Sequence, residues 1–140
     1  MKIEKLTEDH LTRIRLCVAH LWFKDHMGPD WRREVLAAGP GYAAIFGEDV
    51  VAIAGVCDMG HGRAQAWCLM GDGAGRHMTL ITRAVRRFFR LSGFRRIEAI
   101  VKTQFAPGHR WMRLLGFTCE APNLAKYFAD DDGVLYARIC

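Results

Sequence analysis

The chain has 140 residues, of which 51% are hydrophobic and 25% are charged, with a formal net charge of +5 and a pI near 9.2. This composition excludes a disordered chain, and the length fits one domain, which we expect to span residues 1–140. No apolar run approaches the ~18 residues of a membrane span, and the first ten residues lack the apolar stretch of a secretion signal. We therefore expect a cytoplasmic protein without a membrane partner.

The cysteines and histidines do not form a metal-binding pattern. The five cysteines are scattered without a C-x-x-C pair and lie mostly in apolar segments, so we expect reduced, mostly buried thiols. His20 and His26 are six residues apart, which places them on different faces of a helix. Cys57 and His61 lack the second pair of ligands that would close a tetrahedral site. We expect no metal.

The first forty residues predict one short strand and two helices. Residues 2–5 form the strand, and Thr7 caps a helix that runs to about His20. Apolar residues recur along this helix at helical spacing, at Leu11, Ile14, Val18 and Leu21. A second helix opens at Pro29 and ends at Gly39-Pro40-Gly41.

From residue 41 the pattern changes to that of strands. Residues 42–47 and 50–59 are rich in apolar and β-branched residues and form a hairpin around a tight turn at Glu48-Asp49. A loop follows at 59–62, and residues 64–70 form a third strand that ends in the glycine-rich run 71–75.

A long basic helix follows the glycine-rich run. Its apolar residues recur at steps of three and four, at Met78, Ile81, Ala84, Val85, Phe88 and Phe89, and Arg83, Arg87 and Arg90 share the opposite side. Ser92-Gly93 ends the helix, and residues 95–102 form a strand that we expect to pair in parallel with 64–70. A helix at 107–115 and strands at 117–120 and 133–139 complete the chain.

The run from Gly71 to Arg76 is a candidate anion site. A turn that leaves a strand and enters a helix exposes backbone N–H groups, and the helix dipole adds positive potential there. Gly71, Gly73 and Gly75 let a ligand approach the backbone, and Arg76 adds a donor. A merely flexible connection is the alternative, but the position between a strand and an amphipathic helix favours the anion site.

The segment Met70-Gly71-Asp72-Gly73-Ala74-Gly75 resembles the acyl-CoA signature Q/R-x-x-G-x-G/A of the GNAT N-acetyltransferase superfamily. The helix and strand that follow are similar to that superfamily's elements, and HRWMRLLGF, ending in Gly116-Phe117, resembles its second conserved block. The resemblance implies an α/β (α+β) fold in which a central mixed, mostly antiparallel sheet of six to seven strands carries about four helices on its faces.

The resemblance also implies an acyl-CoA site. The backbone of Trp67, Cys68, Leu69 and Met70 would pair with the pantetheine amides, and the N–H groups of Gly71, Gly73, Gly75 and Arg76 would hold the pyrophosphate. Ala74 belongs to the same loop. Phe105, Trp111 and Met112 would line the cofactor from the second block, and Trp67 and Trp111 could line the acyl pocket. The implied reaction is direct attack of a primary amine on acetyl-CoA.

The sequence departs from the superfamily where an acid is expected. Phe105 and Met112 stand where the second block usually has Asn and Tyr, and a methionine cannot donate a proton. Three replacements are candidates: His109 as a proton relay, Asp58 (with His61) as a group that binds or deprotonates the amine, and Tyr127 as a donor. Each has a plain structural alternative as a packed or turn residue.

A second resemblance keeps a non-enzymatic interpretation open. The run His109 to Phe117, with Trp67-Cys68-Leu69, is similar to GNAT-like proteins of tailed bacteriophages and prophages, which suggests a catalytically silent interaction protein that still binds CoA. Nucleic-acid binding through the arginines of residues 83–96 ranks lowest, because no stacking aromatics interleave with them. The expected partners are acetyl-CoA or CoA and an unidentified amine; a homodimer stays open.

Overall fold

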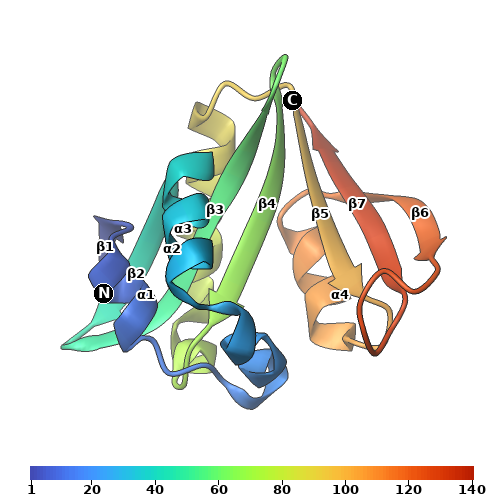
Figure 1. Cartoon of the computed structure of the whole chain (residues 1–140). Coiled ribbons are helices and arrows are strands. Elements are labelled where there is room, and N and C mark those ends of the chain that lie inside the picture. Colours follow the sequence, from blue (N-terminus) through green and yellow to red (C-terminus); the bar gives the residue numbers. More distant parts are fainter. The chain divides into compact units, whose positions relative to one another are not determined.

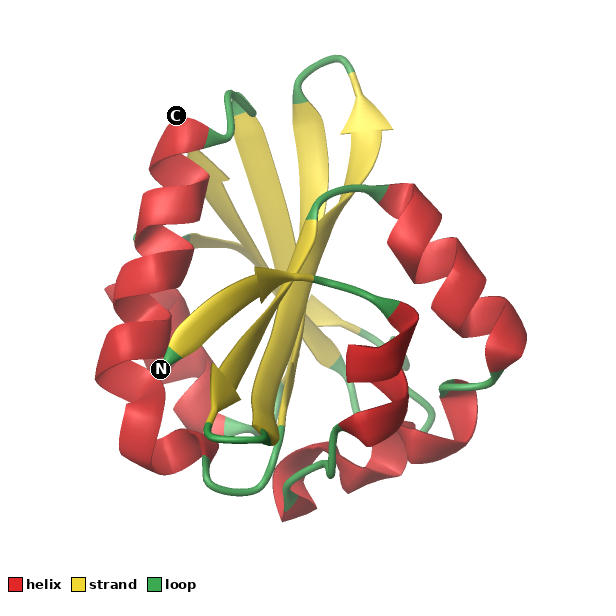
Figure 2. Ribbon diagram, turned by 90° about the vertical axis from the view of Figure 1, so that its left-hand side faces the viewer, coloured by secondary structure: helices red, strands yellow, loops and turns green.

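The computed structural model describes the whole chain, Met1–Cys140 (Figure 1). Its elements in chain order are β1 (Lys2–Lys5), α1 (Glu8–Arg13), the 3-10 helix η1 (Val18–His26), α2 (Pro29–Ala38), β2 (Gly41–Phe46), β3 (Asp49–Gly60), β4 (Arg63–Met70), the 3-10 turn η2 (Ala74–His77), α3 (Met78–Leu91), β5 (Arg96–Lys102), α4 (Ala106–Leu114), β6 (Thr118–Leu124) and β7 (Gly133–Ile139). Short loops join most of these elements (Figure 2).

The strands form a seven-stranded sheet in the order β1-β2-β3-β4-β5-β7-β6. The β1–β2, β2–β3, β5–β7 and β6–β7 pairs are antiparallel, and β4 pairs with β5 in parallel. The parallel ladder consists of the three pairs from Arg63↔Arg96 to Gln65↔Glu98. The predicted class, a mixed and mostly antiparallel sheet with helices, is confirmed.

The chain divides into two compact units that share β3, β4 and α3 between them. The first consists of residues 1–58 and 66–81, and the second of residues 59–65 and 82–140. No helix in either unit is both long and apolar enough to cross a membrane. The expectation of one domain over residues 1–140, and of a cytoplasmic location, stays a prediction.

The core of the first unit lies between its two helices and the strands β2, β3 and β4. Apolar side chains from all five elements and from the adjoining loops are buried in one cluster, formed by Leu6, Leu11, Ile14, Val35, Ala43, Ile45, Val50, Ile53 and Leu69. Phe23 and Trp31 pack against it edge to face, with ring centroids 5.3 Å apart. This burial fixes β4, and with it the start of the glycine-rich loop.

The second unit has its own buried residues, contributed by α3, α4, β5 and β7 and by Phe117 just before β6. Phe89 of α3 packs edge to face on Phe117, with centroids 5.5 Å apart, and the Arg138 guanidinium lies 5.7 Å from the Phe89 ring centroid. Alternate residues of β5, Ile97, Ala99 and Val101, are buried, as expected of a strand with one face on a core. Met112 and Leu115 bury the inner side of α4.

The predicted helix from Thr7 to His20 is wrong beyond Arg13. The α-helix ends there, Ile14 is extended with ψ 132°, and a 3-10 helix begins only at Val18. Val18 and Leu21, which the helical spacing assigned to the core, are 89% and 51% exposed. The cause is tertiary, because the backbone between the two helices bonds to the end of β4 instead of continuing the helix.

Two further expectations need correction. The five cysteines are all free, but none is fully buried: Cys17, Cys57 and Cys68 are half-buried, and Cys119 and Cys140 are exposed. β6 continues to Leu124 instead of stopping at Glu120, because it follows β7 through two register shifts to the pair Leu124↔Gly133. The predicted strand at residues 133–139 matches β7.

Candidate functional site

The glycine-rich loop leaves β4 and enters α3 through one turn of 3-10 helix. Gly73 sits in the left-handed region with φ 83°, which a residue with a side chain adopts only under strain. The N–H of Ala74 donates to the Gly71 carbonyl (3.2 Å) and the N–H of Arg76 to the Gly73 carbonyl (3.3 Å). The loop is therefore a folded turn with its own hydrogen bonds.

Gly71 is the structural glycine of the loop. A Cβ placed there would lie 2.8 Å from the Val50 carbonyl oxygen and 3.1 Å from that of Arg15, so the position is closed to any side chain. Its N–H donates to the Val51 carbonyl at 2.8 Å, so this amide of the predicted pyrophosphate set has a protein acceptor. Gly71 anchors the loop to β3.

Gly73 and Gly75 form the open part of the loop. Both are exposed, and a Cβ at either position would meet nothing within 4 Å. The bonds that hold the loop use the N–H groups of Gly71, Asp72, Ala74 and Arg76, which leaves those of Gly73 and Gly75 outside them. Together with the exposed Arg76 side chain, these amides make a cradle whose chemistry fits a phosphate oxygen.

Met70, immediately before the loop, has its backbone occupied. Its N–H donates to Nδ1 of His20 at 2.8 Å, and its carbonyl accepts the Cys17 N–H at 3.0 Å. The Asp72 N–H donates to the Arg15 carbonyl at 2.8 Å. Because Gly71 bonds to β3, the alternation of a strand places these three bonds on the other edge of β4.

Residues 15–20, which we name the strap, therefore occupy that edge, with the backbone of Arg15 to Cys17 and the side chain of His20. Leu16 forms an isolated antiparallel bridge with Gly71. The sequence analysis missed the strap, because helical spacing of apolar residues runs through it and no local signal marks its break. Pairing of the Met70 backbone with a pantetheine amide requires the strap to give up its bonds to Met70.

Two other predicted residues of β4, Trp67 and Leu69, share one face of the strand and belong to the core of the first unit. Leu69 is buried in the core of the first unit, and the Trp67 ring packs against Trp31 with centroids 6.2 Å apart. Trp67 Nε1 is buried without a hydrogen-bond partner, which is rare for an indole N–H and marks a donor available to a bound group. Burial, with a smaller effect from nearby Cys17, raises the pKa of the Cys68 thiol to about 12.

Three predicted cofactor residues lie on or beside α4 in the second unit. Phe105 is the N-cap residue of this helix, and its ring lies 2.7 Å from where a Cβ on Gly108 would be. Trp111 Nε1 donates to Thr82 Oγ1 of α3 at 2.8 Å. Met112 is only 7% exposed and belongs to the core of the unit. These contacts give Trp111 and Met112 packing roles that require no ligand.

His109 has both ring nitrogens engaged. Nε2 lies 2.9 Å from the Thr103 carbonyl oxygen and Nδ1 lies 2.7 Å from the Tyr136 hydroxyl oxygen. A carbonyl only accepts, so Nε2 carries the proton, and in the neutral ring Nδ1 accepts the Tyr136 O–H. Burial raises the pKa of Tyr136, which keeps its hydroxyl protonated as the donor.

The remaining catalytic candidates, Asp58, His61 and Tyr127, lie in other segments of the chain than His109. Asp58 is exposed near the end of β3, in the first unit. Tyr127 lies in the turn between β6 and β7 of the second unit, 48% exposed, with its ring edge to face on Phe128 at 5.0 Å. The neighbouring candidate His61 has a positive φ of 55°, and its carbonyl accepts from Arg95 at 3.3 Å. This is the turn role foreseen as its alternative.

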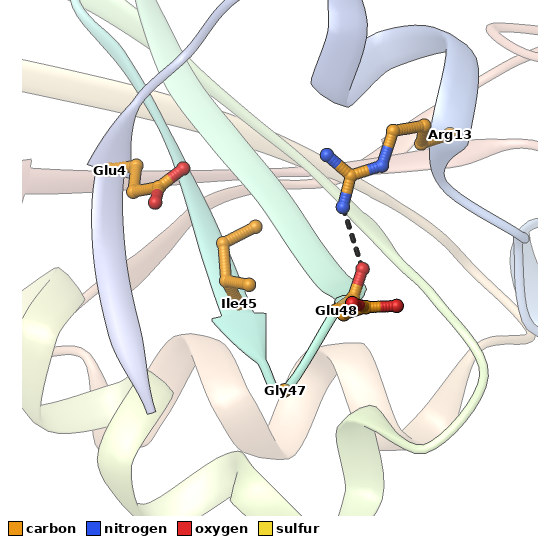
Figure 3. Close-up of a pocket in the computed structure, with 5 residues that line it drawn as sticks. All are labelled: Glu4, Arg13, Ile45, Gly47 and Glu48. Carbon is orange, nitrogen blue, oxygen red and sulfur yellow. Dashed lines mark hydrogen bonds between the residues drawn. The ribbon is translucent and has the colours of Figure 1, made fainter.

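A hollow of the surface lies elsewhere in the first unit. It has a volume of about 450 Å³ and is lined by Glu4, Arg13, Ile45, Gly47 and Glu48 (Figure 3). An Arg13 guanidinium N–H donates to the Glu48 carbonyl at 2.6 Å. The hollow is open and is lined by charges of both signs. The structure contains no group of three or more His, Cys, Asp or Glu side chains placed to bind a metal ion.

No protein-family model and no curated protein sequence matches the chain. Solved structures do. A Bacillus subtilis acetyltransferase in complex with CoA is similar with a TM-score of 0.72 at 16% identity, covering 99% of this chain and 98% of that one. A spermidine/spermine N-acetyltransferase from Vibrio cholerae gives 0.71 at 17% identity over 99% and 91%.

A third structure, an IAA acetyltransferase from Bacillus cereus, is similar with a TM-score of 0.71 at 13% identity, and the similarity covers 99% of each chain. The similarity spans nearly the full length of each protein, so no element of the fold is left over. At identities this low, the similarity establishes the fold only. The substrate and the mechanism have to be argued from the residues of the site. The chain therefore has the fold of the GNAT N-acetyltransferases.

Proposed function

We propose that this protein is an acyl-CoA-dependent N-acetyltransferase that holds the pyrophosphate of acetyl-CoA on the loop from Gly71 to Arg76. The observation that carries the proposal is the open turn at Gly73 and Gly75, which presents two backbone amides beside the Arg76 side chain. The turn occupies the start of α3 in a fold shared with acetyltransferases, one of them solved with CoA. Gly71 keeps the turn in place.

The reaction that fits this site is direct transfer. The nitrogen of a primary amine attacks the carbonyl carbon of the thioester, forming the C–N bond as the C–S bond breaks. The amine proton leaves to a base or to water, and the departing thiolate takes a proton. Asp58 is the candidate base, and His109 and Tyr127 are the candidate donors of that proton.

A second candidate function is a catalytically silent protein that binds CoA, as the similarity to phage and prophage proteins suggests. Two observations favour it. Met112 is buried in the core at the position where an acid is expected, and both nitrogens of His109 are already bonded. In this case acetyl-CoA binds but no amine in a broad panel is acetylated.

Calorimetric titration with acetyl-CoA tests the binding step. Gly75→Glu places a carboxylate where nothing in the fold resists it, and the negative charge should repel the pyrophosphate and weaken binding at least tenfold. Gly28→Glu is the matched control, because Gly28 also precedes a helix and also has open space around it. Equal affinities of the two variants, or no heat from the wild type, would contradict the proposal.

Release of CoA thiol with a panel of amines then tests transfer. The panel should include polyamines, aromatic amines, amino acids and a peptide with a free N-terminus. A Cys119→Ser/Cys140→Ser background removes the exposed thiols that would otherwise react with the detection reagent. Turnover with any amine supports the enzyme, and binding without turnover across the panel supports the silent protein.

A further inference from the structure

The structure shows an uncompensated basic surface on the helices α3 and α4 of the second unit. Six exposed arginines lie on these two helices: Arg83, Arg86, Arg87, Arg90, Arg110 and Arg113. We name them the arginine surface. No side chain of the six takes part in any hydrogen bond or ion pair of the structure, and neither helix contains a single acidic residue.

Several cations elsewhere in the molecule are paired with carboxylates. Arg13 bonds Asp9, Arg63 and Arg96 bond Glu98, and Lys102 bonds Asp130, at 2.7 to 3.0 Å. Along the sequence, residues 73–119 hold ten of the 20 lysines and arginines but only one of the 15 acidic residues, Glu98. That one carboxylate faces Arg63 and Arg96. A helix face that is only solvated usually carries both basic and acidic side chains. The separation of the basic residues from the acidic ones therefore favours an anionic partner.

The two helices present one surface because they are joined side by side. Trp111 of α4 bonds Thr82 of α3 at 2.8 Å. Arg86 follows Thr82 by one helical turn and therefore lies beside that contact. Arg110 precedes Trp111 on the outer side of α4, opposite the buried Met112.

Each position on this surface is an arginine. The chain has five lysines, and none lies on α3 or α4. Arginine binds phosphate through two parallel N–H donors, which a lysine cannot do. From Arg83 to Arg90 the helix rises about 10 Å, a length over which a duplex presents about six phosphate charges.

The aromatic rings of both helices indicate whether the arginine surface fits double-stranded or single-stranded nucleic acid. Phe89 is 5% exposed, and Trp111 is half-buried with its N–H bonded to Thr82. Phe88 is half-buried, and its ring centroid lies 5.9 Å from that of Phe89. None of the three rings forms the exposed platform on which unpaired bases stack. A membrane is also disfavoured, because the apolar side of α3, with Ile81 and Phe89, is packed inside the protein and cannot insert.

We propose that the arginine surface binds the phosphate backbone of double-stranded nucleic acid without reading its sequence. The arginine surface contains none of the residues of the glycine loop, and the inference does not depend on acetyl transfer. It assigns a role to the basic excess that the proposed acetyltransferase leaves unexplained.

Fluorescence anisotropy with a labelled DNA duplex of about 20 base pairs tests the proposal. For about four phosphate contacts, affinity should fall about 100-fold between about 50 and 200 mM salt. Arg83→Gln/Arg86→Gln/Arg90→Gln should weaken binding at least tenfold and lower the salt slope by about 3. The control Lys2→Gln/Lys5→Gln/Lys24→Gln removes the same charge from exposed residues of the first unit and should bind as the wild type does.

Circular dichroism and acetyl-CoA titration verify that the triple arginine variant is folded. No duplex binding at low salt overturns the proposal, and so does an equal loss in the two triple variants, which would indicate a net-charge effect. Tighter binding to the unpaired strand of the same sequence overturns the duplex assignment. Binding to phosphatidylcholine vesicles only when they contain phosphatidylserine, with no binding to the duplex, assigns the surface to membranes instead.

Discussion

His109 Nδ1 lies 2.7 Å from the hydroxyl oxygen of Tyr136, joining α4 to β7. Tyr136 is only 5% exposed, so its hydroxyl depends on this acceptor. His109→Ala should lower the free energy of unfolding by about 1–3 kcal/mol, since it leaves that hydroxyl unsatisfied, and Tyr136→Phe by about 1 kcal/mol. Urea unfolding of both variants and the double variant measures the coupling, for which we expect about 1 kcal/mol.

The same pair separates a structural histidine from a catalytic one. If His109 donates the proton to the thiolate, His109→Ala lowers kcat by about 100-fold or more, whereas Tyr136→Phe retains most of it. Equal activity of the two variants would remove His109 from the reaction.

The two kinds of glycine in the loop should respond differently to substitution by alanine. Gly71→Ala forces a Cβ against backbone carbonyls of β3 and the strap, and we expect a loss of about 1–3 kcal/mol of stability. Gly75→Ala enters open space and should leave the stability within about 0.5 kcal/mol of the wild type. Thermal unfolding compares the two, and a destabilised Gly75→Ala would mean that the open space is occupied in solution.

The strap provides a test of the pantetheine position. In the wild type, His20 holds the Met70 N–H at 2.8 Å. His20→Ala frees that donor. If a pantetheine carbonyl accepts from it, acetyl-CoA should bind about fivefold more tightly, because a bond worth ~1 kcal/mol no longer competes. His26→Ala changes an exposed histidine further along η1 and is the control. Unchanged calorimetric affinity in His20→Ala would indicate that the strap stays closed.

The five thiols should react at different rates. Cys119 and Cys140 are exposed, whereas burial raises the pKa of Cys57 and raises that of Cys68 to about 12. Only the thiolate is a nucleophile, so at mildly alkaline pH iodoacetamide should modify Cys119 and Cys140 first and Cys68 last. Mass spectrometry of the peptides gives the order. Early modification of Cys68 in the folded protein would show that its strand is open to solvent.

The carboxylates around Arg96 should make stability depend on pH. Burial acts to raise the pKa of Glu98, but hydrogen bonds from Arg63 and Arg96 hold it below its ordinary value, and the bond from Arg96 lowers the pKa of Glu120. A carboxyl whose folded pKa is depressed stabilises the protein above the unfolded pKa and loses that contribution as pH falls through the folded value. Stability should therefore decline below about pH 5.

Arg96→Gln removes most of this dependence. The variant should be less stable at neutral pH and should change less on acidification than the wild type. Arg95→Gln is the control, because Arg95 is exposed and donates to the His61 carbonyl instead of a carboxylate. Urea midpoints at neutral and acid pH give both slopes. Parallel slopes for Arg96→Gln and wild type would contradict the assignment.

The sequence by itself determined the order of most elements and the position of the glycine-rich loop between a strand and a helix. Alternating and β-branched runs predicted the strands, the spacing of apolar residues predicted α3, and the glycines between β4 and α3 predicted an anion site, because each of these signals is local. The resemblance of Met70 to Gly75 to the acyl-CoA signature rested on the same local pattern, and the fold it implied is the fold observed.

Only the tertiary structure decided which polar groups meet. The strap on Met70 replaced a helix that local periodicity favoured, since hydrogen bonds to β4 outweigh the small differences in helix propensity. His109 and Tyr136 are 27 residues apart, and their pairing depends on how α4 docks on β7. The sequence located the basic residues, but their lack of carboxylate partners is a property of the folded surface.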